Sequence, residues 1–140
     1  MSKLENQYRI FVVDDEPIIA STLGEILRRQ GFDVTSFTDP LKALEALHTK
    51  APDLMILDVV MPEMSGIDLA IVVRATFPNC IVLLFSGQVA TSQLLESAKN
   101  RGHNFEVLSK PVPPTELLAR VFSELWPDSR PHGPTGALLS

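Results

Sequence analysis

Leu54-Met55-Ile56-Leu57-Asp58-Val59-Val60-Met61-Pro62 is the stretch that decides the fold of this chain. Its first four residues are apolar and lead directly into the carboxylate of Asp58. A continuous apolar run of this length is typical of a strand buried on both faces, as in a parallel sheet covered by helices. Asp58 then lies at the carboxyl end of that strand, the edge of an open α/β sheet where ligands bind. A buried strand has no structural need for a carboxylate there, so we expect Asp58 to have partners.

The composition indicates a single compact domain. The chain has 140 residues, of which 45% are hydrophobic, and a net charge of -5. This is enough to build a hydrophobic core. No run of Lys or Arg stands out, so nucleic acid is not favoured as a direct partner.

Cysteine usage and hydropathy bear on the cellular compartment. The single cysteine, Cys80, excludes a disulfide framework and fits a reducing environment, and we interpret it as a small core residue. No apolar stretch approaches the roughly 18 residues of a membrane helix. The polar N-terminus argues against a signal peptide. We therefore expect a cytoplasmic domain with no membrane partner.

Predicted strands and helices alternate along the chain. Apolar runs predict strands at 8–13, 32–37, 54–58, 80–85 and 105–108. Helical periodicity predicts helices that begin near 17, 40, 67, 91 and 114 and end before 31, 49, 78, 102 and 126. This alternation predicts a doubly wound α/β domain with right-handed crossovers. The periodicity is lost after Trp126, so we expect a domain of residues 1–126 and a flexible tail of residues 127–140.

Each helix is predicted to face the sheet with an apolar stripe. The stripes include Ile18, Ile19, Leu23 and Leu27 in the first helix, Leu41, Leu44 and Leu47 in the second, and Leu94, Leu95 and Ala98 in the fourth.

Five polar residues follow the predicted strands: Asp14, Asp15, Asp58, Ser86 and Lys110. A parallel sheet brings the carboxyl ends of its strands to one edge, so we expect the five to lie together. Three clustered carboxylates would repel one another, and a hard divalent cation such as Mg²⁺ removes that penalty. A carboxylate beside a cation, an ammonium and a hydroxyl is arranged to receive a phosphoryl group. Taken one at a time, these residues could equally be solvated turn and cap residues.

The same residues resemble a known family. Asp14-Asp15-Glu16, the segment from Asp58 through Met61-Pro62 to Gly66, Ser86-Gly87 and Lys110-Pro111 are similar to the receiver domain of bacterial two-component response regulators. The resemblance covers about residues 9–126, and the segment from Asp58 to Gly66 is its most specific part. It implies a five-stranded parallel sheet of strand order 2-1-3-4-5 with five helices, and a cis Lys110-Pro111 bond.

The resemblance also implies a role for each site residue. Asp58 would accept phosphate from the phosphohistidine of a sensor histidine kinase or phosphotransfer protein. Asp15 would bind Mg²⁺ directly, Asp14 would bind it through water, and the carbonyl of Val60 would be a further ligand. Ser86 would be the switch hydroxyl and Lys110 the partner of the phosphate. The domain would be a stand-alone receiver, or one separated from its output domain, and would catalyse only its own phosphorylation and dephosphorylation.

Two positions depart from the family pattern. The residue three before the lysine is usually aromatic and here is Val107, with Phe105 two residues earlier; a polar residue is frequent where this chain has Val60. We therefore expect phosphorylation to act through Ser86 and the loop 87–90, which would move the fourth helix. The surface that binds a downstream protein would then be the fourth helix, fifth strand and fifth helix.

Three other functions share parts of this pattern. A phosphatase with a nucleophilic aspartate, by family likeness, needs a second acid at the position of Val60. A flavin-binding module needs amides that hold phosphate after the first strand, where Asp14 and Asp15 would repel it. A pseudo-receiver that acts only as a scaffold is expected to lack an acid or the lysine, and this chain retains them.

Overall fold

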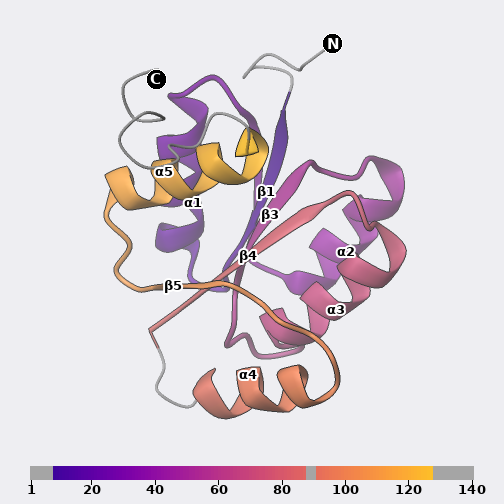
Figure 1. Ribbon diagram of the computed structural model, residues 1–140. Helices are drawn as coiled ribbons and strands as arrows, with labels where there is room; N and C mark the ends of the chain where they lie inside the picture. The colour runs from indigo at the N-terminus through magenta and orange to yellow at the C-terminus, as the bar shows by residue number, and fades with distance from the viewer. Residues whose placement is uncertain (1–7, 88–90, 128–140) are drawn as a thin grey trace.

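The computed structural model describes residues 8–87 and 91–127. Within them, five strands alternate with five helices (Figure 1). The strands are β1 (Arg9–Val13), β2 (Asp33–Phe37), β3 (Leu54–Asp58), β4 (Ile81–Ser86) and β5 (Val107–Ser109). The helices are α1 (Pro17–Arg28), α2 (Pro40–Thr49), α3 (Gly66–Thr76), α4 (Thr91–Asn100) and α5 (Pro114–Leu125). All strand pairs are parallel and the order is β2-β1-β3-β4-β5, so the predicted fold and strand order are confirmed.

The sheet separates two hydrophobic layers. Because successive side chains of a strand point to opposite faces, alternate residues of the central strands enter different layers. Ile10, Val12, Leu54, Ile56, Leu83 and Phe85 pack with α1 and α5. Phe11, Val13, Met55, Leu57, Val82 and Leu84 pack with α2, α3 and Ala98 of α4. Figure 1 shows α1 and α5 together on one side of the sheet, with α2 and α3 on the other.

Local sequence explains where several helices begin and end. Asp39 caps α2 by accepting a hydrogen bond from the backbone N–H of Leu41, and Ser65 caps α3 by accepting one from Asp68. Pro17, Pro40 and Pro114 stand in the first turns of α1, α2 and α5, where a missing N–H costs nothing. The Lys110-Pro111 bond is cis, as predicted.

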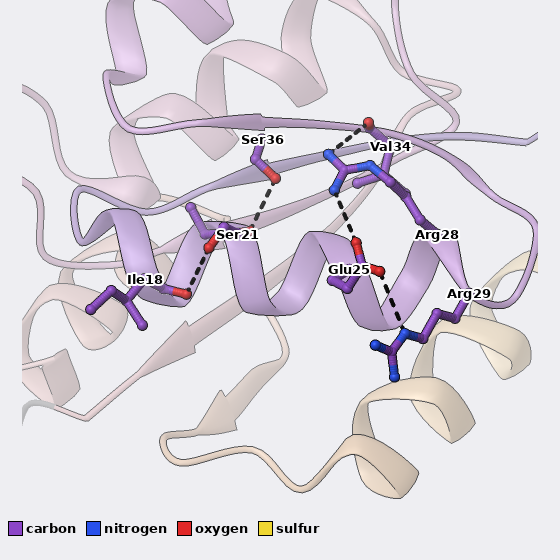
Figure 2. Close-up of polar contacts among 8 residues, drawn as sticks. Ile18, Ser21, Glu25, Arg28, Arg29, Val34 and Ser36 are labelled. Atoms are coloured by element: carbon purple, nitrogen blue, oxygen red, sulfur yellow. Dashed lines mark hydrogen bonds and ion pairs between the residues drawn. The ribbon is translucent and has the colours of Figure 1, made fainter.

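Polar contacts fasten α1 to β2, the outer strand of the sheet. Ser36 donates from its hydroxyl to the carbonyl of Ala20 at 3.0 Å, and Arg28 donates to the carbonyl of Val34 at 3.2 Å (Figure 2). Glu25 holds the Arg28 and Arg29 guanidinium groups on the same helix. These contacts fix α1, and therefore the loop between β1 and α1, against the sheet.

Three residues predicted to face the sheet are exposed instead. The exposed fractions are 79% for Ile18, 48% for Leu41 and 40% for Leu94. Each stands within the first four residues of its helix. Figure 2 shows Ile18 on the side of α1 away from β2.

The last strand is shorter than predicted. β5 begins at Val107, so Phe105 lies in the segment that leads to it. Arg74 of α3 holds this segment, because its guanidinium donates to the carbonyl of Asn104 at 2.6 Å and lies 4.0 Å from the Phe105 ring centroid.

Aromatic rings pack together just after α5. The Trp126 ring meets Tyr8 edge-on at 4.9 Å and also contacts Phe32 and Phe122. The predicted tail lies outside the described residues beyond Pro127. Within 8–87 and 91–127, no helix combines the length and apolarity needed to cross a membrane.

Candidate functional site

Three of the predicted site residues are spaced two positions from the last inward-facing residue of their strand, so their side chains follow the same face. Asp14 comes two residues after Val12, Asp58 two after Ile56, and Lys110 two after Leu108. Val12, Ile56 and Leu108 all belong to the layer packed against α1 and α5. Asp14, Asp58 and Lys110 therefore extend one face of the sheet beyond its carboxyl edge.

The lysine ammonium lies between two buried carboxylates. Lys110 Nζ is 2.9 Å from Asp14 Oδ2 and 3.3 Å from Asp58 Oδ1. Asp14 is fully buried and Asp58 is 4% exposed. The other oxygen of Asp14, Oδ1, accepts a hydrogen bond from the backbone N–H of Glu16 at 2.8 Å. Asp14 is thus held by one backbone donor and one cation.

The negative charge of Asp58 is only partly compensated by Lys110. Burial and the neighbouring charge of Asp14 raise the pKa of Asp58 to about 6, although Lys110 opposes the change. For Lys110, burial acts to lower the pKa, but the hydrogen bond to Asp14 and the charge of Asp58 outweigh it, so that its pKa is raised. One ammonium therefore does not compensate the carboxylates around it.

Asp15 completes an acidic cluster with Asp14 and Asp58. One carboxylate oxygen from each of the three lies within 4.8 Å of the others. Asp15 is half-buried, whereas the other two are buried. Hard divalent cations prefer oxygen ligands, and an unbalanced negative charge favours their binding. The donor set therefore fits such an ion.

Ser86 and Val60 lie at the same edge but are placed differently. Ser86 ends β4, and its carbonyl accepts a hydrogen bond from the Lys110 N–H at 3.0 Å. The Ser86 side chain continues the series of alternate residues Val82 and Leu84. Those two side chains belong to the layer packed against α2, α3 and α4. Val60 follows β3 and is 43% exposed. The roles predicted for the Ser86 hydroxyl and the Val60 carbonyl stay predictions.

Gly66 fixes the loop after the predicted acceptor. Its backbone N–H donates to the carbonyl of Val59 at 2.8 Å. A Cβ at this position would lie 2.1 Å from the carbonyl oxygen of Asp58, a distance that no side chain tolerates. The first turn of α3 can therefore approach Asp58 only because residue 66 is glycine.

Sequence reasoning missed Phe85. Its ring centroid lies 4.7 Å from Lys110 Nζ, on β4 directly opposite Asp58 in the sheet register. The residue was assigned only to an apolar strand. An aromatic residue just before the strand-end serine was the available signal, but its relation to Lys110 depends on a register that the sequence does not give.

The comparisons with known sequences identify a family. The model of the response regulator receiver domain matches residues 10–122. The DNA-binding response regulator MtrA of Mycolicibacterium smegmatis is 38% identical over 117 residues, covering 84% of this chain and 50% of that protein. The probable transcriptional regulatory protein TcrX of Mycobacterium tuberculosis is 31% identical over 112 residues, covering 80% of this chain and 47% of that protein. The chain thus spans about half the length of the curated relatives it matches.

Solved structures agree in fold. An uncharacterized protein from Neptuniibacter caesariensis superposes with a TM-score of 0.77 at 35% identity, over 84% of this chain and 87% of that one. The response regulator TrrA from Thermotoga maritima, crystallised in complex with Mg²⁺ and BeF, gives a TM-score of 0.72 at 29% identity, over 85% and 99% of the two chains. Together with the family match over most of its length, these likenesses show that the chain belongs to the response regulator receiver domain family.

Proposed function

We propose that Asp58 is the phosphoacceptor of this receiver domain and that Lys110 stabilises the charge on the transferred group. The observation that carries the proposal is the Lys110 ammonium held 2.9 Å from Asp14 and 3.3 Å from Asp58 in a buried site. A positive group fixed there before reaction needs no reorganisation as negative charge develops on the phosphoryl oxygens. Ser86 would donate a hydrogen bond to the same oxygens.

The reaction is a phosphoryl transfer to a carboxylate. An oxygen of Asp58 forms a bond to phosphorus while the bond from phosphorus to the donor breaks, and the leaving group keeps that electron pair. From a phosphohistidine the leaving atom is an imidazole nitrogen, which takes up a proton; from acetyl phosphate the leaving group is acetate. The product is an acyl phosphate on Asp58, and water would later release it. We propose that the domain promotes only these two reactions on itself.

Asp14, Asp15 and Asp58, with the carbonyl of Val60, would hold Mg²⁺. The support is the set of three carboxylate oxygens within 4.8 Å, which is an oxygen-only donor set of high negative charge. Bound there, Mg²⁺ would neutralise the oxygens of the transferring phosphoryl group. TrrA, in complex with Mg²⁺ and BeF, supplies a precedent within the family.

The test of the acceptor is a mass measurement. The chain is incubated with acetyl phosphate and Mg²⁺, and a single phosphoryl adduct is expected on Asp58. Asp58→Asn should abolish it because an amide is a poor nucleophile, whereas Asp53→Asn, at the opposite end of β3, should keep it. An adduct mapped to any other residue would overturn the assignment. A complete failure of the parent to react would favour a pseudo-receiver that acts as a scaffold.

The test of the metal site is an NMR titration. Mg²⁺ should shift the amides of the loop after Val13 with an affinity of order millimolar, because waters keep much of the coordination shell. Asp15→Asn should weaken the binding several-fold. Equal affinity of this variant and the parent would show that Asp15 is not a ligand.

The phosphoryl donor would dock on the apolar groove beside Lys110. A groove of about 340 Å³ beside Lys110 is lined by apolar residues that include Ile18, Leu23 and Val112. We propose a sensor histidine kinase or phosphotransfer protein as the donor, with an apolar surface around its phosphohistidine. Ile18→Asp should slow labelling by a phosphorylated kinase that labels the parent, and should leave labelling by acetyl phosphate unchanged. A loss of both, or of neither, would contradict this docking site.

We propose that the signal leaves through Ser86 and α4, toward a protein that binds the face of α4, β5 and α5. The backbone bond from Lys110 to the Ser86 carbonyl supports a link between the acceptor site and β4. Of the loop expected to move, residues 88–90 lie outside the described residues. Ser86→Ala should still accept phosphate but lose the phosphorylation-dependent NMR shifts in α4, and Val107→Ala should keep them. The reverse result would refute a switch based on Ser86.

A further inference from the structure

The Lys110 side chain rests on an aromatic ring that the proposed chemistry does not use. Its Nζ lies 4.7 Å from the Phe85 ring centroid, within the roughly 6 Å over which a cation is attracted by the face of an aromatic ring. Phe85 is 1% exposed and the Lys110 side chain 17% exposed, so little water competes for this contact. The same ammonium also contacts Asp14 at 2.9 Å and Asp58 at 3.3 Å.

The ring is fixed by the sheet itself. Phe85 is the register partner of Asp58, and its carbonyl accepts a hydrogen bond from the Val59 N–H at 3.1 Å. Paired residues of neighbouring strands project to the same face, so the ring and the Asp58 carboxylate stand side by side under the lysine. The ring packs with the layer of α1 and α5 and lines the groove beside Lys110.

The lysine stem is confined on a further side. A Cβ at Gly87 would lie 3.4 Å from Lys110 Cβ and 3.9 Å from its Cδ, so the backbone of Gly87 runs alongside the stem. A lysine has four flexible side-chain torsions and a compact charge that can be directed many ways. Without the ring, the ammonium would keep its attraction to the carboxylates but would lose the aromatic surface on which it rests.

We propose that Phe85 is a positioning residue, whose ring holds the Lys110 ammonium by a cation–π contact at the point where charge develops during phosphoryl transfer. This inference rests on the proposed roles of Asp58 and Lys110. Its magnitude follows from the usual worth of a cation–π contact: loss of the attraction should slow transfer by between about 2-fold and 30-fold.

The test replaces Phe85 by phenylalanines that carry increasing numbers of ring fluorines, because fluorine withdraws the negative charge from the ring face with little change in size. The rate of phosphorylation by acetyl phosphate should fall stepwise along this series. The matched control is the same series at Phe11, a buried ring of the opposite layer that packs on Phe37 at 4.9 Å and has no contact with Lys110 among those the structure describes. The Phe11 series should leave the rate unchanged.

A spectroscopic measurement accompanies the rates. Protons at the end of the Lys110 side chain should show the ring-current shift of a group above an aromatic face, and Phe85→Leu should remove that shift while Phe11→Leu keeps it. A flat rate across the Phe85 series, equal losses in both series, or an unchanged shift in Phe85→Leu would overturn the inference. These results are distinct from failure of the proposed function, in which the parent itself would not form an adduct on Asp58.

Discussion

Replacing the predicted acceptor Asp58 by asparagine should stabilise the metal-free protein. The folded state raises the pKa of Asp58 from its ordinary 3.8 to about 6, because the carboxylate is buried beside Asp14. Each tenfold change in acid dissociation corresponds to about 1.4 kcal/mol, so the ionised group costs the fold about 3 kcal/mol above the folded pKa. Asparagine keeps the shape and carries no charge. We expect a gain of about 1–3 kcal/mol at pH 7.5, since Lys110 also loses one of its two carboxylate partners.

The pH dependence follows from the direction of the pKa change. Between pH 3.8 and about 6 the folded parent holds a proton on Asp58 that the unfolded chain releases, so this group contributes stability at low pH. That contribution is lost as the pH rises through the folded pKa. The advantage of Asp58→Asn should therefore be largest above pH 7 and should shrink toward zero near pH 4.

The assay is urea unfolding in EDTA, followed by the fluorescence of Trp126. That ring packs on Tyr8 and so reports on the edge of the sheet opposite the acidic site. The control is Glu63→Gln, an exposed carboxylate of the loop after β3, which should change stability by less than about 0.5 kcal/mol. Millimolar Mg²⁺ should stabilise the parent more than Asp58→Asn. If Asp58→Asn unfolds at the same or a lower urea concentration than the parent at pH 7.5, the ionised Asp58 carboxylate does not destabilise the fold.

Three further substitutions test the supports of the site by the same unfolding assay. Lys110→Met should lower the free energy of unfolding of the metal-free protein by about 3 kcal/mol, because Asp14 and Asp58 lose their shared cation. Mg²⁺ should restore part of this stability. An unchanged stability in EDTA would contradict the ion pairs. Gly66→Ala should lower the free energy of unfolding by at least about 1–3 kcal/mol, because its Cβ would clash with the Asp58 carbonyl. An unchanged stability would show that α3 can shift. Arg74→Gln should cost about 1–2 kcal/mol and speed amide exchange of the segment before β5, whereas Arg101→Gln, an exposed arginine of the same region, should do neither.

The acidic site could be predicted from the sequence because its parts are set by strand ends. Asp14, Asp58 and Lys110 each follow an apolar run, and a parallel sheet admits only one edge for such ends. That these three residues lie together, with Lys110 Nζ 2.9 Å from Asp14 and 3.3 Å from Asp58, could therefore be expected from the strand ends. The same reasoning places Ser86 at that edge, although it says nothing about which way its hydroxyl points.

Predictions failed where a contact between elements decided the outcome. The helical period assigned Ile18 to the buried side of α1, but its side chain is 79% exposed and lies on the side of α1 away from β2 (Figure 2). The apolar run from Phe105 to Leu108 was assigned to one strand, but β5 begins at Val107, and Arg74 of α3 contacts the Asn104 carbonyl and the Phe105 ring just before it. Neither the exposure of a helix's first turn nor the reach of an arginine from another element is encoded in local periodicity.

The register of the sheet decides to which face each residue of the site points. Asp58 and Lys110 continue the face of α1 and α5, whereas Ser86 continues the face of α2, α3 and α4. A shift of β4 by one residue would turn Phe85 to the other face of the sheet and take its ring away from Lys110. In the observed register the Lys110 ammonium rests on the Phe85 ring, and Ser86 continues the other face of β4. Acceptance of the phosphoryl group and its readout are therefore expected to meet at the carboxyl edge of the sheet, where the Lys110 N–H bonds the Ser86 carbonyl.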